Sequence, residues 1–302
     1  MSDDVTTILA SAIRLSVPLG FAGVGEYIAE RAGTLNISVE AMMLCGAYGG
    51  AVGSSVSHNA ALGFLWGMAA GLVVAVIHAN FSHRLQANTF VVGLTLNVLA
   101  LGLTNYLLEK VAMTPRQVGV WKVPLLWRIP VVGKPLFAER WPAYLLFAIV
   151  PVVWWVMQRS RWGLEMRSVG ENPKAADVTG IHVNKRRRQG LYVCGIMAGF
   201  GGAYLSIAEV GTFNSNMTAG RGFIVIAAVI FGGWTLMGTL GGCFLFGGVD
   251  ALRLALPALG YTINPELLIA APYLIALLAL CFFAKRLRQP AALAQPFERG
   301  AA

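Results

Sequence analysis

The sequence predicts an all-α protein, one polytopic bundle of about nine transmembrane helices, and two observations carry this prediction. Of the 302 residues, 57% are hydrophobic and only 12% are charged, about half the charged fraction (~25%) of soluble domains. The charges are also clustered, so that long tracts contain none of Asp, Glu, Lys and Arg. These tracts are 41–83, 85–108, 141–158, 189–208, 222–249 and 267–284. Despite the net charge of +9, this pattern excludes a soluble enzyme, a nucleic-acid binder and a disordered linker.

A helix needs about 20 apolar residues to cross the hydrocarbon core, and the tracts divide accordingly. A polar turn at 54–59 splits the first tract into two spans. Glycines around Gly232-Gly233-Trp234 interrupt the fifth, which predicts a hairpin of two shorter helices. The predicted spans are 5–25, 37–54, 61–80, 89–108, 141–157, 189–209, 222–233, 238–254 and 267–284. Nine is the preferred number within a range of eight to ten, and residues 1–302 form one domain.

The distribution of Lys and Arg predicts the orientation of the bundle. If 158–188 and the C-terminus face the cytoplasm, 14 cations lie inside and seven outside. The positive-inside rule therefore favours an N-terminus outside and a C-terminus inside. The segment 1–4 lacks the cationic start of a cleavable signal peptide.

Small residues predict tight helix packing, and the cysteines predict no special chemistry. Glycines at 46, 49, 50 and 53, and again at 195, 199, 201 and 202, have the small-xxx-small spacing that lets helix backbones approach closely. The four cysteines (Cys45, Cys194, Cys243 and Cys281) each stand alone in an apolar run. We expect them to be buried small hydrophobes, with no metal site and no cofactor.

The polar segment 158–188 predicts a short helix between the fifth and sixth spans. Asn172 can cap this helix, Pro173 suits its first position, and Gly180 suits its end. Two interpretations follow from the residues alone. The helix docks into a groove of a partner protein, or it rests on lipid headgroups, held there by the basic run 185–188.

The string 170–176 (GENPKAA), followed by Gly180-Ile181, resembles the cytoplasmic coupling-helix motif of bacterial ABC importer permeases. The most similar group contains the ribose, branched-chain amino acid and nucleoside systems. This resemblance implies that the helix fits a cleft on a separate ATPase subunit and transmits ATP-driven motion to the membrane helices. The implied coupling residues are Gly170, Glu171, Asn172, Pro173, Lys174, Ala175, Ala176, Asp177 and Gly180.

Four charged residues and one asparagine lie within 26–40, flanked by apolar sequence: Glu26, Glu30, Arg31, Asn36 and Glu40. Charges at membrane depth must face water, protein or one another. A helix begins near Ser38, and an interrupted helix whose free end faces a polar cavity is one way to build a substrate path. Alternatively, Glu30 and Arg31 pair in water within a short loop, and Glu40 lies at the membrane interface.

Three further strings resemble the nucleoside-type branch of these permeases. They are ERAGTLNISVEAMM at 30–43, GLTLNVLALGL at 93–103, and the pair MTAGRGF at 217–223 and FGGW at 231–234. The departures are Ala41, where glycine is usual, and Leu236, where proline is usual. The resemblance covers about residues 20–285 and implies one permease with no fused ATPase.

Asn97, a polar residue in the middle of a predicted span, has two open interpretations. It bonds neighbouring helices together, or it lines the pathway and binds solute. Phe90 and Phe213 are possible stacking faces for a ring, although most aromatic residues in spans are core or lipid-facing. The predicted pathway residues are Asn36, Ser38, Glu40, Phe90, Thr95, Asn97, Phe213, Asn214 and Asn216. Asp250 and Arg253, at i,i+3 spacing, are expected to form an ion pair.

The sequence therefore predicts a transport subunit and not an enzyme. No phosphate-binding GxxxxGK[ST] loop occurs, so the energy must come from elsewhere. The resemblance implies a bacterial inner-membrane location and three partners: a second permease (a paralogue or a second copy), a cytoplasmic ATPase, and an extracytoplasmic solute-binding lipoprotein. Its branch implies a nucleoside-like solute, with a simple sugar next. The alternative is a stand-alone secondary transporter or channel, which would need ionisable residues deep in several spans.

Overall fold

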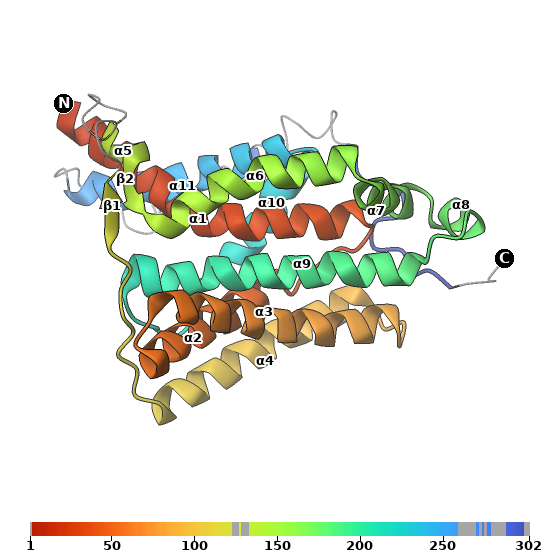
Figure 1. Cartoon of the computed structure of the whole chain (residues 1–302), viewed down its shortest axis with the longest axis horizontal. Coiled ribbons are helices and arrows are strands. Elements are labelled where there is room, and N and C mark those ends of the chain that lie inside the picture. The colour runs from red at the N-terminus through yellow and green to blue at the C-terminus, as the bar shows by residue number, and fades with distance from the viewer. Residues whose placement is uncertain are drawn as a thin grey trace.

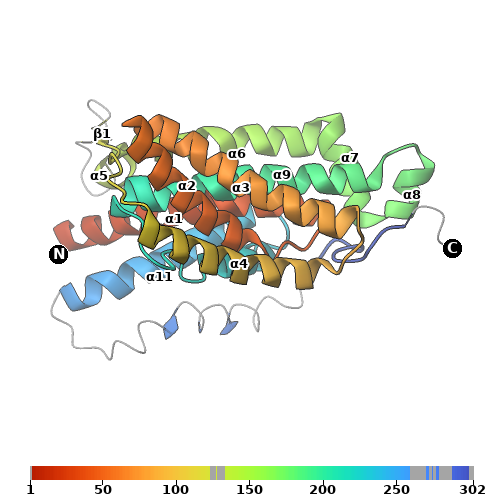
Figure 2. The same ribbon diagram turned by 90° about the horizontal axis from the view of Figure 1, so that it is seen from below.

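The computed structural model describes residues 2–122, 127, 133–258, 270–271, 274, 277–278 and 288–298. Its helices run nearly parallel to one long axis, and the two chain ends lie at opposite ends of the bundle (Figures 1 and 2). We call the end that carries α8 the α8 end, and the other the β end, since it carries two short strands.

The first half of the chain contains α1 (Ser2–Arg31), α2 (Val39–Ser57), α3 (Ala60–His83) and α4 (Thr89–Lys110), then β1 (Val120–Lys122), α5 (Gly133–Phe137) and β2 (Ala138–Arg140). The second half contains α6 (Trp141–Arg159), α7 (Arg161–Glu171), α8 (Pro173–Val178), α9 (Val183–Ala203), the π-helix η2 (Tyr204–Val210), α10 (Arg221–Phe231) and α11 (Leu236–Ala258). The fold is mostly helical as predicted. The antiparallel pair β1–β2, in which Val120 lies opposite Arg140, was not expected in an all-α chain.

Six helical segments among the described residues are long and apolar enough to cross a membrane. They are Thr6–Arg31, Ala60–His83, Thr89–Lys110, Trp141–Arg159, Val183–Val210 and Leu236–Pro257. Helix α2 has 19 residues, and α10 is a shorter apolar helix of 11 residues. Most of the predicted span 267–284, with Cys281, lies outside the described residues.

Helix α1 continues to Arg31, past the predicted end at 25. The prediction ended the span there because carboxylates follow, at Glu26 and Glu30. Both carboxylates are fully buried in the bundle, so the charges did not mark a loop. The interpretation of Glu30 and Arg31 as a pair in water is therefore wrong.

Glycine backbones hold α2, α3 and α9 together at the centre of the bundle. A Cβ on Gly46 would lie 2.5 Å from the Cα of Gly199, and one on Gly71 would lie 2.2 Å from the carbonyl oxygen of Gly195. No side chain fits at such separations, so these contacts are backbone against backbone. We call this contact the glycine seam; it confirms the close approach predicted from glycine spacing.

The predicted hairpin at 222–254 is present as α10 and α11, joined by a turn at 232–235. Helix α10 is short because the segment before it, 211–220, is irregular, with positive φ at Gly211, Asn216, Ala219 and Gly220. Glycine tolerates this conformation, whereas Asn216 and Ala219 adopt it at some cost. The N-terminus of α10 consequently lies inside the bundle, where it meets the start of α2.

Candidate functional site

Glu40 lies where α2 and α10 both begin, and its side chain is 7% exposed. One carboxylate oxygen accepts hydrogen bonds from the Thr218 hydroxyl at 2.6 Å and the Gly220 N–H at 2.9 Å. The other accepts from the Gly222 N–H at 2.6 Å. The carboxylate thus binds the positive end of α10. Glu40 is not the interfacial carboxylate that the sequence left open.

Asn97 of α4 binds the backbone at the start of α2. Its side-chain oxygen accepts from the Ala41 N–H, and its amide nitrogen donates to the carbonyl oxygen of Ile37, both at 2.9 Å. Ser38, which precedes α2, makes no capping bond with its own side chain. Asn97 therefore supplies the missing cap from a neighbouring helix, which supports its interpretation as an interhelical bond.

A continuous chain of hydrogen bonds joins Glu26 to Thr89, and all but its last bond are buried. The carboxylate of Glu26 accepts from the Asn36 side chain at 2.9 Å, and the Ser38 hydroxyl donates to Asn36 at 2.8 Å. The same hydroxyl lies 2.6 Å from Nδ1 of His78, and His78 Nε2 lies 2.8 Å from the Thr89 hydroxyl. Asn36 and Ser38, both predicted pathway residues, are thus wholly engaged with protein.

Glu30 continues the polar interior toward the α8 end. Its carboxylate accepts from the indole N–H of Trp234, in the turn between α10 and α11, at 2.5 Å. This bond fixes the turn against α1. Arg31, the next residue, pairs with Glu171 at 3.7 Å instead.

The other predicted pathway residues do not join this cluster. Phe213 is buried against α2, with its ring edge-on to Tyr48 at 5.3 Å, so it is part of the core. Phe90, Thr95, Asn214 and Asn216 are exposed on the outside of the chain. The Thr95 hydroxyl bonds its own helix at the carbonyl oxygen of Val91, at 2.9 Å.

The short helix α8 has the caps that the sequence predicted. The Asn172 side chain accepts from the Ala175 N–H at 3.0 Å, and Pro173 is the first residue. Gly180, at φ +88°, donates to Asp177 at 2.9 Å, and Ile181 donates to Ala176 at 3.0 Å. These two bonds form a Schellman motif, which requires a left-handed residue here.

Helix α8 presents most of its surface to solvent. Ala176 is buried against Val169 and Val183, whereas Val178 is 89% exposed. Glu171, Asn172 and Lys174 are also exposed. A Cβ on Gly170 would lie 2.1 Å from the carbonyl oxygen of Arg31, so this glycine places the loop directly on the end of α1.

The C-terminal segment 288–298, which we call the tail, crosses the α8 end and binds three parts of the chain. The Ala292 N–H donates to Gly170 at 2.9 Å, and the Ala294 N–H donates to Gly33 at 3.1 Å. The buried guanidinium of Arg187, on α9, donates to the carbonyl oxygens of Gln295 at 2.5 Å and Ala292 at 3.3 Å. The tail thus joins the segment before α8 to the loop before α2.

Three ion-paired side chains meet at the β end. Glu209 pairs with Arg14 at 3.0 Å and with Arg140 at 3.4 Å. Glu139, 5% exposed, lies beside them. Burial raises the pKa of Glu139 from 4.5 to about 7, partly offset by Arg14. The expected ion pair between Asp250 and Arg253 is also present, at 2.8 Å, and Arg221 joins it at 3.0 Å.

Sequence reasoning missed several residues that build this interior: Glu26, His78, Trp234, Thr218 and Arg187. None of them is among the predicted pathway or coupling residues. A signal existed only for Glu26, which is an intramembrane carboxylate and hence a functional candidate by default. The partners of the others come from segments up to 204 residues apart, which no local spacing reveals.

A family model described as the permease component of the branched-chain amino acid transport system matches residues 8–281. The chain belongs to this permease family. Its match covers every helix from α2 to α11, including α8 and the Glu40 junction.

The chain is also similar to individual proteins that are named as permeases of ABC transporters. The nucleoside ABC transporter permease of Lactococcus lactis is 35% identical, over 91% of this chain and 92% of that protein. A guanosine ABC transporter permease of Bacillus subtilis is 32% identical, over 98% of both. A glucose ABC transporter permease of Haloferax volcanii is 31% identical, over 82% of this chain and 70% of that protein. A second guanosine permease of B. subtilis also matches, at 28% identity. The chain is therefore a permease subunit of an ABC importer.

Proposed function

We propose that this permease pairs with a second permease to import a nucleoside, driven by an ATPase that docks on α8. The observation that carries the proposal is similarity over nearly the whole chain to permeases named for nucleoside and guanosine transport. A sugar is the second candidate, because a relative named for glucose also matches. An extracytoplasmic binding protein delivers the solute.

Two features of α8 support its role as the coupling helix. It is built from its own caps, so it keeps its shape without a partner. Its last residue, Val178, exposes an apolar side chain, which suits burial in a groove of another protein. The coupling residues are those predicted, Gly170 to Asp177 and Gly180.

The exposed pathway residues support a solute path between two permeases. Thr95 and Gly102 lie seven positions apart on one face of α4, and nothing within 4 Å would meet a Cβ on Gly102. Asn105, on the same helix, accepts from Ser215 of the 211–220 segment at 2.8 Å. Thr95, Asn214 and Asn216 therefore offer hydroxyl and amide groups along an outer surface that a second permease would enclose. The side chains behind this outer surface hold it in place through their hydrogen bonds inside the bundle. They are Glu40, Asn36, Ser38 and Asn97.

The second permease is a paralogue. B. subtilis contains two matching proteins that are both named guanosine permeases, which supports a heterodimer.

For the membrane topology, we propose nine crossing segments. They comprise the six long apolar helices, α2, the half-length α10, and 267–284. Chain ends at opposite ends of the bundle require an odd total number of membrane crossings. The excess of cations near α8 supports a cytoplasmic α8 end, with the C-terminus inside and the N-terminus outside.

The solute is tested by reconstitution. The permease, a candidate partner permease, ATPase and binding protein are placed in liposomes, and ATP-dependent uptake of labelled guanosine is compared with that of glucose. We expect saturable guanosine uptake that excess glucose does not reduce. Uptake by this permease alone, without ATP or a second protein, would contradict the proposal and favour a secondary transporter.

The docking role is tested separately. Val178→Ser should weaken binding of the ATPase by about tenfold, the equivalent of ~1.4 kcal/mol. Val56→Ser, which changes an exposed valine at the β end, is the matched control and should bind the ATPase as the wild type does. Equal affinities for the two variants would exclude α8 as the docking helix.

A further inference from the structure

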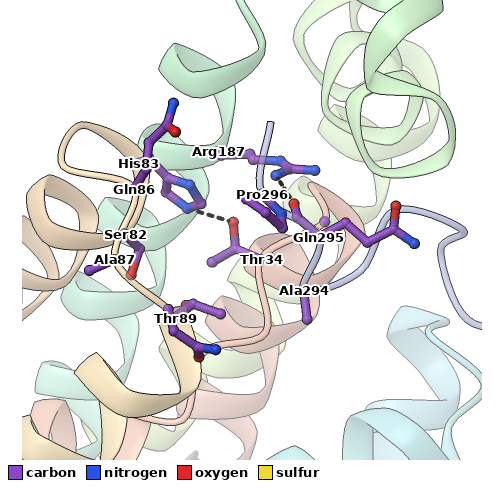
Figure 3. Close-up of a pocket in the computed structure, with 12 residues that line it drawn as sticks. Thr34, Ser82, His83, Gln86, Ala87, Thr89, Arg187, Ala294, Gln295 and Pro296 are labelled. Carbon is purple, nitrogen blue, oxygen red and sulfur yellow. Dashed lines mark hydrogen bonds between the residues drawn. The ribbon is translucent and has the colours of Figure 1, made fainter. Parts of the chain in front are cut away.

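A polar pocket of about 190 Å³ lies at the α8 end, apart from the proposed solute path. Four segments form it: the loop before α2, the turn between α3 and α4, the start of α9, and the tail (Figure 3). Its volume exceeds the ~30 Å³ that one water molecule occupies in the liquid. The pocket therefore has room for a small polar ligand together with water.

The charge of the pocket is one-sided. Its lining contains the cation Arg187 but no aspartate or glutamate. The Arg187 side chain is 1% exposed, and its two described acceptors are neutral backbone carbonyls. No carboxylate lies within ion-pair distance of it in the part of the chain that the structure describes. A buried charge without a counter-charge is costly, so this site favours an anion.

Unused hydrogen-bond donors accompany this charge. Ser82 lines the pocket, and the residue is 7% exposed. Its hydroxyl group has no hydrogen-bond partner among the described residues. The Nε–H of Arg187 is also buried without an acceptor there. Buried polar groups in proteins are normally paired. An oxyanion in the pocket would supply the missing acceptor for such a donor and a counter-charge for the guanidinium.

We propose that this pocket binds an oxyanion the size of a phosphate group, supplied either as free phosphate or as the headgroup of an anionic phospholipid. Thr34 and His83, bonded to each other at 2.9 Å, form the wall opposite the tail (Figure 3). Ala294, Gln295 and Pro296 close the other side. The bound anion therefore stabilises the tail in its position on Arg187.

Inorganic phosphate is the first probe. The full chain is purified in a non-ionic detergent, and its unfolding midpoint is followed with a thiol-reactive dye that labels the buried cysteines. Ligand that binds only the folded state raises the midpoint in a saturable way. We expect such a rise with phosphate and none with chloride at equal ionic strength.

Variants assign this effect to the pocket. Ser82→Ala and Arg187→Lys should weaken phosphate binding by about tenfold, the equivalent of ~1.4 kcal/mol. Ser215→Ala, an exposed serine on the 211–220 segment, should leave it unchanged. If Arg187→Lys does not fold, Ser82→Ala still decides. Equal phosphate titrations of Ser82→Ala and the wild type would overturn the proposal, as would equal effects of phosphate and chloride.

The source of the anion is resolved in nanodiscs. In discs of phosphatidylcholine alone, free phosphate should still raise the midpoint of the wild type. If discs that contain phosphatidylglycerol give a higher midpoint before phosphate is added, and phosphate then has no further effect, the headgroup is the native ligand. If phosphate acts equally in both discs, free phosphate is the ligand.

Discussion

Glu40 connects two helices that begin inside the bundle. Its two oxygens accept three hydrogen bonds from Thr218, Gly220 and Gly222. Bonds to a charged group contribute about 1.5–3 kcal/mol each. The side chain thus joins α2 to the half-length helix α10.

Replacing Glu40 with Gln is expected to lower both stability and transport. The amide keeps one acceptor but places an N–H group toward backbone N–H donors. We expect the unfolding midpoint in detergent to fall by roughly 5 °C, and ATP-driven uptake to fall with it. Glu109→Gln, at the exposed end of α4, is the control. An unchanged midpoint for Glu40→Gln would mean that its hydrogen bonds contribute little.

Asn97→Leu distinguishes the two original interpretations of that residue. The leucine leaves the Ala41 N–H and the Ile37 carbonyl without partners, at about 1–3 kcal/mol for each buried group. We therefore expect reduced yield and a lower unfolding midpoint. Asn105→Leu, on the same helix but with a side chain that accepts from the exposed Ser215, should keep the wild-type midpoint. Normal stability with lost uptake in Asn97→Leu would instead favour solute contact.

The short helix and the tail are the elements that most need testing, because they meet at Gly170. A chain ending at Gln289 removes the acceptors of Arg187 and the donor to Gly170. We expect faster hydrogen exchange in α7 and α8 and weaker coupling of ATP hydrolysis to uptake. A chain ending at Glu298 keeps every described tail contact and should behave as the full chain does. Unchanged exchange in the shorter chain would show that the tail does not hold α8.

These elements also show what sequence can predict. Helix α8 was predictable because its caps, Asn172, Pro173 and Gly180, are local, and the glycine seam followed from regular spacing. The end of α1 was not, because Glu26 and Glu30 look like loop residues until their partners Asn36 and Trp234 are placed beside them. The predicted pathway residues divide into buried and exposed ones, and this division also depends on contacts between distant segments. Asn97 and Glu40 bind backbone groups that only the tertiary structure brings near.

The stability of the protein is expected to depend on pH through Glu139. Its folded pKa of about 7 exceeds its ordinary value of 4.5, so the folded state binds the proton more tightly than the unfolded state does. Its contribution to stability is therefore present below pH 4.5 and is lost as the pH rises to about 7.

Glu139→Gln removes this dependence. At pH 8 the variant should unfold roughly 5 °C above the wild type, whereas at pH 4.5 the two midpoints should nearly coincide. Thermal unfolding in detergent at both pH values measures this. A difference of equal size at both pH values would show that Glu139 does not carry the raised pKa.

The glycine seam has a mechanical consequence. Backbones already in contact at Gly46, Gly71, Gly195 and Gly199 have no side-chain layer to compress or rearrange, so we expect α2, α3 and α9 to move as one rigid body. Any alternation between outward-open and inward-open states must then be accommodated elsewhere. The segment 211–220, with its left-handed residues, and the half-length α10 are the parts able to hinge, and Glu40 is where this hinge is anchored to the rigid body.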